Sequence, residues 1–316
     1  MRIKAFLALL FIIIISTKAF SQVIITTTLP DSISHWDNTN KVGLDINQVA
    51  FINWSVGGNN AISGVIKGEF DRNYTKKNVN WANELILRYG LNSQEGQEVR
   101  KTDDKIQLTS TFGYRKDTIS NWYYSAKFNF NTQFANGYAY PNTDDEISGP
   151  FSPAYIFLGI GSEYKRKDLG LTVYMSPLTN KTTLVLNQTL ANKGAFGVDK
   201  AIYDDLGNLI KSGKNSRTEV GTLLTAQLKR QIFKNIMMDQ RISLYSDYIN
   251  KFGNIDVDWQ LQLDMTVNEY VKANIGTQLI YDNDIKSTKE VEGEVVTAGP
   301  KIQLKQMLGV GLSYTF

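Results

Sequence analysis

Charged residues that could do chemistry recur at every second position of strand-like segments. In the segment 255–267, Asp256, Asp258 and Asp264 fall on one face together with glutamines, while the other face is apolar. Side chains alternate between the two faces of a strand, so this pattern predicts a strand with one charged side. Three carboxylates would be strongly destabilising in a dry core, whereas a transmembrane barrel would turn them towards a polar lumen.

The same alternation on other strands predicts a lumen in which both signs of charge are interspersed. The candidate lumen-lining residues are Glu84, Arg88, Lys105, Arg115, Lys127, Arg241, Asp256, Asp258, Asp264, Lys272 and Lys305. A lumen of one sign would indicate an ion-selective pore, whereas a mixture is compatible with a wet channel or a closed network of ion pairs. We expect the three aspartates to pair with Arg or Lys, and Arg241 is the inward cation of the neighbouring strand.

No catalytic residue, metal site or cofactor is predicted. The chain has one histidine, His35, which lies before the predicted barrel, and it has no cysteine. A general base must reach its nucleophile within hydrogen-bond distance, so His35 would have to fold onto the barrel to serve a lipid-modifying enzyme. Acidic loop residues offer oxygen ligands that suit Ca²⁺, but they lack EF-hand spacing and such loops are usually only solvated. These weak calcium candidates are Asp144, Asp145, Asp282 and Asp284.

The segment 302–316 alternates between an apolar face and a polar or small face up to its last residue. Such a long strand suits the lipid-facing wall of a barrel. Its aromatic end resembles the terminal strand that outer-membrane assembly machinery recognises, so Tyr314 and Phe316 are the candidate assembly signal. The expected partners are therefore outer-membrane lipid and the barrel assembly machinery.

The first residues have the pattern of an export signal. Arg2 and Lys4 precede an apolar stretch over 5–15, and small residues around position 20 form a cleavage site. This pattern predicts a cleaved signal peptide over 1–21 and, with the barrel pattern, an outer-membrane location. Residues 22–40 show no clean period and are expected to form a periplasmic lead-in, which leaves 41–316 for the barrel.

Composition excludes several classes of protein. The chain has 34 Lys and Arg against 31 Asp and Glu, and the two balance once the three basic residues of the predicted signal peptide are removed. A neutral mature chain gives no reason to expect a nucleic-acid partner. After the signal peptide, no stretch approaches the run of about 20 apolar residues that a membrane helix needs.

The lengths of the connections predict the topology. Short connections such as 231–235 alternate with longer ones such as 135–152, as in barrels with short periplasmic turns and long outer loops. The chain is therefore predicted to be all-β, a closed antiparallel transmembrane barrel of about 12 strands, with 14 as the alternative if 23–29 is recruited. A long outer loop is expected near 177–216. Its strand-like piece 182–189 is interpreted as an outer hairpin or an inward-folded plug.

Local motifs also resemble a known family. They are Asn47-Gln48, Asn53-Trp54-Ser55-Val56-Gly57-Gly58-Asn59-Asn60, Trp81-Ala82-Asn83, Tyr89-Gly90, Asp103-Asp104-Lys105, Thr132-Gln133-Phe134, Gly137-Tyr138, Ser152-Pro153-Ala154-Tyr155, Ser176-Pro177-Leu178-Thr179, Gly194-Ala195-Phe196-Gly197-Val198 and Tyr281-Asp282. In this order they resemble the uncharacterised domain-of-unknown-function family 3078 of Bacteroidota, over roughly 40–316. The resemblance implies an outer-membrane barrel and no established activity.

Three functions are compatible with this sequence. The first is a narrow small-solute channel of the outer membrane. The alternative is a non-conducting structural or scaffold barrel in an envelope assembly, with an unknown envelope protein as partner. An outer-membrane lipid-modifying enzyme is the third, and the single histidine argues against it, so we do not expect an enzyme.

Overall fold

The structure is a computed structural model that describes residues 34–50, 59–250, 252–291 and 294–316. The predicted signal peptide, the lead-in up to residue 33 and positions 53–58 of the motif that begins at Asn53 lie outside the described residues. The described chain from His35 to Phe316 forms one compact unit. No helix within the described ranges is long and apolar enough to cross a membrane.

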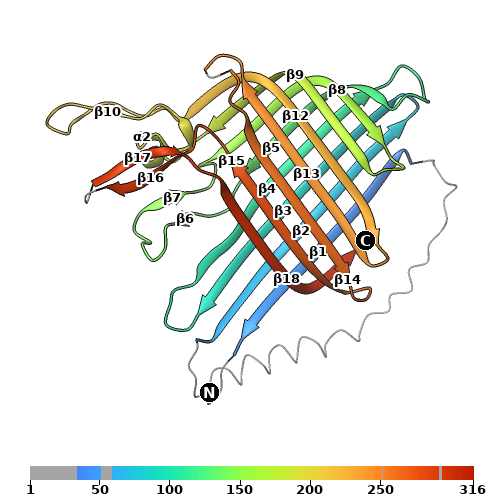
Figure 1. Cartoon of the computed structure of the whole chain (residues 1–316), viewed down its shortest axis with the longest axis horizontal. Coiled ribbons are helices and arrows are strands. Elements are labelled where there is room, and N and C mark those ends of the chain that lie inside the picture. The colour runs from blue at the N-terminus through green and yellow to red at the C-terminus, as the bar shows by residue number, and fades with distance from the viewer. Residues whose placement is uncertain (1–33, 51–58, 251, 292–293) are drawn as a thin grey trace. The chain divides into compact units, whose positions relative to one another are not determined.

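Twelve antiparallel strands form a closed barrel, as predicted (Figure 1). They are β1 (Trp36–Val49), β2 (Ala61–Lys76), β3 (Val79–Gln94), β4 (Arg100–Tyr114), β5 (Trp122–Thr132), β8 (Ala154–Arg166), β9 (Leu171–Leu184), β12 (Ser216–Phe233), β13 (Ile236–Asp247), β14 (Asp256–Thr266), β15 (Val271–Tyr281) and β18 (Gln303–Thr315). The barrel closes where β1 pairs with β18, with Leu44 opposite Leu312. Beyond the ends of this ladder, Asn40 and Phe316 exchange two backbone hydrogen bonds of 2.9 Å.

The two faces of the wall differ in polarity. On β18, Leu304, Leu308 and Leu312 are at least 59% exposed on the outside, whereas the inward Ser313 is buried. Asp45 and Asn274, on the neighbouring strands, are also buried on the inside. An apolar exterior around a polar interior is the arrangement of an outer-membrane barrel, because lipid covers the outside and polar groups are satisfied within.

Aromatic side chains gather at the end of the barrel that has the short turns. Trp36 contacts Tyr74 and Trp81 with ring centroids 5.2 and 5.8 Å apart. Tyr314 stacks on Phe316 at 5.5 Å, and both rings are exposed. Aromatic rings are favoured at membrane–water interfaces, so this group has the composition of an interfacial belt.

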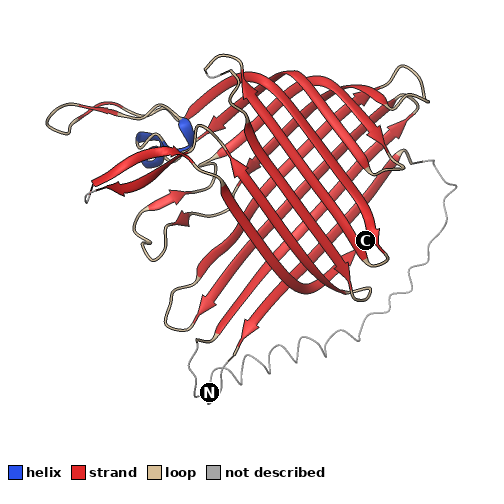
Figure 2. Ribbon diagram, in the orientation of Figure 1, coloured by secondary structure: helices blue, strands red, loops and turns tan. Residues whose placement is uncertain are grey.

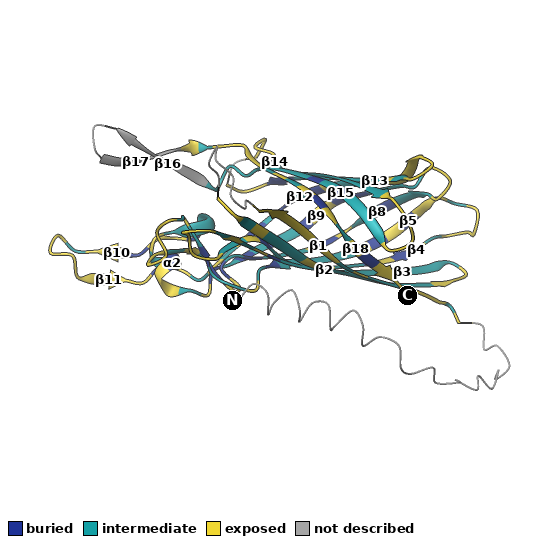
Figure 3. Cartoon of the chain, turned by 90° about the horizontal axis from the view of Figure 1, so that it is seen from below, coloured by how far each residue is buried: buried dark blue, intermediate teal, exposed yellow. Residues whose placement is uncertain are grey.

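Three small hairpins and two short helices belong to the longer loops at the opposite end (Figures 2 and 3). The hairpins are β6 (Gly137–Tyr138) with β7 (Glu146–Ser148), β10 (Ile202–Tyr203) with β11 (Leu209–Lys211), and β16 (Lys286–Val291) with β17 (Glu294–Pro300). The helices α2 (Gln188–Asn192) and η1 (Ala195–Gly197) lie in the longest loop, between β9 and β12.

Two expected boundaries were wrong. Residues 36–40, expected in the lead-in, are the first part of β1. The strand expected to end near 176 continues to Leu184, so the piece at 182–184 is wall and the long loop covers 185–215. Proline cannot donate to a strand ladder, so a strand is expected to end before Pro177. Here the register shifts opposite it on both neighbouring strands, so Pro177 lies in a β-bulge where no donor is needed.

Candidate functional site

The lumen contains a cavity of about 410 Å³ that is lined by polar and charged side chains of nine strands. Eight of its lining residues are cationic: Lys41, Lys67, Arg88, Lys105, Lys229, Arg241, Lys272 and Lys305. Five are acidic: Asp45, Glu69, Asp103, Asp239 and Asp264. Inward glycines on β15 and β18, at positions 276 and 309, leave part of this space open.

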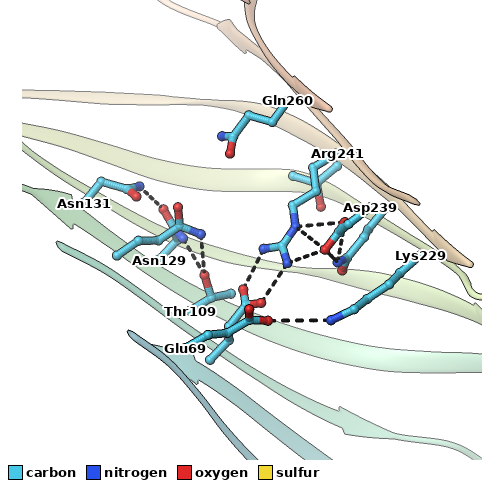
Figure 4. Close-up of polar contacts among 12 residues, drawn as sticks. Glu69, Thr109, Asn129, Asn131, Lys229, Asp239, Arg241 and Gln260 are labelled. Atoms are coloured by element: carbon cyan, nitrogen blue, oxygen red, sulfur yellow. Dashed lines mark hydrogen bonds and ion pairs between the residues drawn. The ribbon is translucent and has the colours of Figure 1, made fainter. Parts of the chain in front are cut away.

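Ion pairs cross the lumen between opposite walls (Figure 4). The guanidinium of Arg241 on β13 donates two hydrogen bonds, of 2.7 and 2.8 Å, to the carboxylate of Glu84 on β3. These strands are six places apart in either direction around the barrel, so they face each other. Asp239 accepts a further hydrogen bond of 2.8 Å from Arg241. The bidentate geometry fixes the guanidinium at the middle of the lumen.

A second pair joins the next two facing strands. Lys229 Nζ on β12 lies 3.6 Å from the carboxylate of Glu69 on β2, and these strands are again six places apart (Figure 4). We call the four residues Glu69, Glu84, Lys229 and Arg241 the lumen bridge. The lumen bridge narrows the interior with side chains of the barrel strands alone, because both of its ion pairs join residues of β2, β3, β12 and β13.

The lysines of the predicted lining meet different partners. Lys305 donates to Asp103 at 2.6 Å, and Arg88 Nε lies 3.2 Å from the same carboxylate. Lys105 faces the amide oxygen of Gln260 at 3.5 Å, which is at the limit of a hydrogen bond. Lys272 lines the cavity near the end with the short turns.

The three aspartates of β14 have separate partners, and Arg241 is not among them. Asp256 accepts a hydrogen bond of 2.9 Å from Lys181, and Asp264 accepts one of 3.2 Å from Lys41. Asp258 accepts hydrogen bonds from the side-chain amides of Gln260 and Gln278. The expected Arg or Lys partner is therefore confirmed for Asp256 and Asp264 and was wrong for Asp258. Arg241 pairs with none of the three, because its long side chain reaches across the barrel to Glu84.

The half of the lumen next to β5, β8 and β9 is packed. Tyr174, Leu223 and Tyr245 form a buried cluster, with Phe157 against it. Lys127 Nζ donates to Thr225 at 3.0 Å and lies 5.2 Å from the centroid of the Tyr174 ring. We call Tyr174, Leu223 and Tyr245 the packed cluster. It fills its own side of the lumen, whereas the other side contains the cavity.

Arg115 lies just beyond the end of β4, outside the cavity. It donates to the carbonyl of Ser120 at 3.2 Å, and its guanidinium lies 5.4 Å from the Tyr123 ring centroid. It therefore caps the packed side at the short-turn end.

Several partners were missing from the candidate residues, for identifiable reasons. Lys181 follows Pro177 on β9, where the strand was expected to have ended. Asp239 lies two residues from Arg241, which was already placed inward, so extending the alternation would have found it. Lys41 is the first residue of the predicted barrel, where the alternation had only begun. The pairing across the barrel had no signal in the sequence.

The calcium candidates occupy two different loops and face cations. Asp145 lies 3.8 Å from Lys193, and Asp144 belongs to the same β6–β7 loop. After β15, Asp282 lies 3.7 Å from Lys181 and Asp284 lies 3.0 Å from Arg217. Burial raises the pKa of Asp282 above its ordinary value, and nearby Lys181 opposes that shift.

Among the described residues, one acidic group has oxygens close enough together to hold a metal ion, namely Glu69, Asp71 and Glu84. Two of these three carboxylates belong to the lumen bridge and already face Lys229 and Arg241. The arrangement is therefore that of an ion-pair network.

Comparisons with solved structures concern the fold. The chain is similar to the translocator domain of the autotransporter NalP from Neisseria meningitidis, with 14% identity, coverage of 89% of this chain and 87% of that one, and a TM-score of 0.36. It is similar to an outer-membrane channel from Pseudomonas putida F1, with 11% identity, coverage of 88% and 95%, and a TM-score of 0.40. It is also similar to the NanC porin, with 9% identity, coverage of 87% and 98%, and a TM-score of 0.37. Similarities this low do not identify what the chain does.

No curated protein matches the chain significantly. The family model described as "protein of unknown function (DUF3078)" matches residues 46–138, which include the motifs from Asn47-Gln48 to Gly137-Tyr138. The motifs from Ser152 onwards lie beyond the matched segment. Over residues 46–138 the family model therefore agrees with the resemblance that the motifs indicate.

Proposed function

We propose that this outer-membrane barrel is a narrow channel for small polar solutes. The cavity of about 410 Å³ beside the lumen bridge carries the proposal, because it is lined by ionisable groups of both signs. Such groups can replace part of the hydration of a polar solute. The apolar outer wall supports a membrane location, and a cleaved signal peptide would direct the chain there.

The lumen bridge makes the proposed channel a restrictive one. Arg241 and Glu84 occupy the middle of the interior, and their side chains are only 23% and 21% exposed. A solute must pass around this pair, through the side where the cavity lies. We therefore expect low conductance from the wild-type barrel.

Conductance in planar bilayers tests the proposal. The Glu84→Gln/Arg241→Gln double variant removes both charges of the central pair and shortens the side chain that crosses the lumen, so its single-channel current should exceed that of the wild type. The matched control is Asp199→Asn/Lys214→Gln, which removes a pair 2.6 Å apart in the outer loop and should leave current unchanged. Absence of current from the wild type and the bridge variant alike would contradict a channel.

The second candidate is a non-conducting scaffold, possible because side chains alone can seal a small barrel. The packed cluster favours it, since Tyr174, Leu223 and Tyr245 leave little room on that side of the lumen. Crosslinking in intact cells would reveal an envelope partner on the loops or the outer wall. A conducting barrel without any crosslinked partner would count against this candidate.

The proposal includes no catalytic role. His35 lies before β1, where its ring packs edge-on against Tyr74 with centroids 5.8 Å apart. A histidine in this position supports the interfacial aromatic group. We assign the exposed pair Tyr314 and Phe316 to recognition by the barrel assembly machinery and to contact with lipid.

A further inference from the structure

Three cations stand side by side on the inner face of the barrel. Lys67 on β2 is the direct cross-strand partner of Arg88 on β3, and Arg88 is the direct partner of Lys105 on β4. Like charges directly opposite each other in a sheet are destabilising. We call Lys67, Arg88 and Lys105 the basic row. All three line the cavity.

The neighbouring carboxylates only partly neutralise the basic row. Asp45 lies 2.9 Å from Lys67 and also accepts a hydrogen bond from Asn274. Asp103 is shared between Arg88 and Lys305, which reaches it from β18. Four cations therefore face two carboxylates in this part of the cavity.

The imbalance extends to the whole cavity lining. Each of its five carboxylates has a Lys or Arg nitrogen within 4 Å. Within the described part of the chain, no salt bridge of that length includes Lys105 or Lys272, which also line the cavity. Lys105 and Lys272 thus line the cavity without a carboxylate within 4 Å, although Asp258 is near Lys105 and Asp264 is near Lys272.

We propose that the basic row is a binding site for a small oxyanion, a carboxylate or phosphate of the size of citrate or inorganic phosphate. Lys105 would be the main contact, because its only hydrogen bond within the described residues is the long one to Gln260. An oxyanion between Lys105 and Arg88 would accept charge-assisted hydrogen bonds and offset the repulsion within the row. The inference names a solute class for the proposed channel, and binding can be tested without conduction.

The test is isothermal titration calorimetry of the full-length barrel in detergent at low salt, with sodium citrate and sodium phosphate as separate probes and choline chloride as the cationic control. The wild type should bind at least one of the two anions and not choline. Lys105→Gln should weaken binding by about tenfold or more, since hydrogen bonds to charged groups are the strong ones. Lys105→Arg keeps the charge and should retain most of the affinity.

Lys127→Gln is the matched control, because it removes one lumen lysine that lies outside the cavity lining. Its anion affinity should equal that of the wild type, and the heat-dependent shift on gels should show that every variant is folded. Failure of the wild type to bind either anion, or equal binding by Lys105→Gln, would overturn the site. Anion binding by a barrel that passes no current would instead overturn the channel and leave the site intact.

Discussion

The two halves of the lumen are built from the same alternating strands, yet they are filled differently. On the side of β5, β8 and β9, aromatic rings pack together and enclose Lys127. On the side of β1, β15 and β18, inward glycines and polar side chains border the cavity. The comparison shows that one barrel can fill one side of its lumen with a packed cluster and keep a polar cavity on the other.

The two halves differ in how their lysines meet carboxylates. In the packed half, Lys127 meets a hydroxyl and an aromatic face, and the buried Lys181 lies within 4 Å of three carboxylates. In the open half the ratio is reversed, because Glu69 and Asp103 are each shared between two cations. Charges near water lose less hydration than buried ones, so the open half tolerates a larger and less balanced set.

The largest expected effect concerns the seam of the open half, where β18 closes on β1. Replacing both Tyr314 and Phe316 by Asp should abolish membrane insertion, because charges at the lipid-facing end remove the aromatic contacts and the candidate assembly signal. Cell fractionation with a heat-modifiability gel measures this. Tyr203→Asp, on the exposed β10–β11 hairpin, is the control and should insert normally.

A double variant found as folded barrel in the outer-membrane fraction would rule out that assignment. Insertion of the single Phe316→Asp variant alone would instead assign the signal to Tyr314.

The second effect is a loss of stability in the packed half. Tyr245→Ala should lower the free energy of unfolding by about 3 kcal/mol, because the side chain is 4% exposed and its removal leaves a cavity beside Tyr174 and Leu223. Urea unfolding in lipid vesicles, followed by tryptophan fluorescence, measures the change. Tyr203→Ala, half-exposed on its hairpin, should change stability little. Equal losses for the two variants would mean that the packed half is not a core.

The third effect concerns the lumen bridge, which joins the two halves. Arg241→Gln alone should lower stability by about 2 kcal/mol, since it leaves Glu84 and Asp239 without their cation. The Glu84→Gln/Arg241→Gln variant should recover part of this loss, and the same unfolding assay gives the coupling energy. Additive losses from the two single variants would show that the pair does not act as a unit.

The smallest expected effect on stability concerns one lysine of each half, Lys127 in the packed half and Lys272 in the open half. Lys127→Met should change stability by less than about 1 kcal/mol, because the apolar side chain can pack against Tyr174 while one hydrogen bond to Thr225 is lost. Lys272→Met, in the open half, should have a similarly small effect on stability and a larger one on anion binding. A large stability loss for Lys127→Met would show that its charge is structurally required.

Alternation along the sequence determined the fold and the direction of most side chains. The pattern in 255–267 placed its aspartates inside, and the connection lengths gave twelve strands. This works because a strand has a strict period of two, and lipid outside a barrel requires an apolar face on every strand. The pattern failed at Pro177, where a bulge carries β9 past a residue that normally ends a strand.

Only the tertiary structure decided which charges meet. Arg241 lies opposite Gln260 and diagonal to Asp258 in the sheet, yet it bonds Glu84 on the facing wall. Periodicity specifies the face of a residue and gives no information about which strands oppose each other across the lumen. That depends on the number of strands, the register at closure and the reach of each side chain. The same three quantities also bring the basic row and the glycines of β15 and β18 to the lining of one cavity.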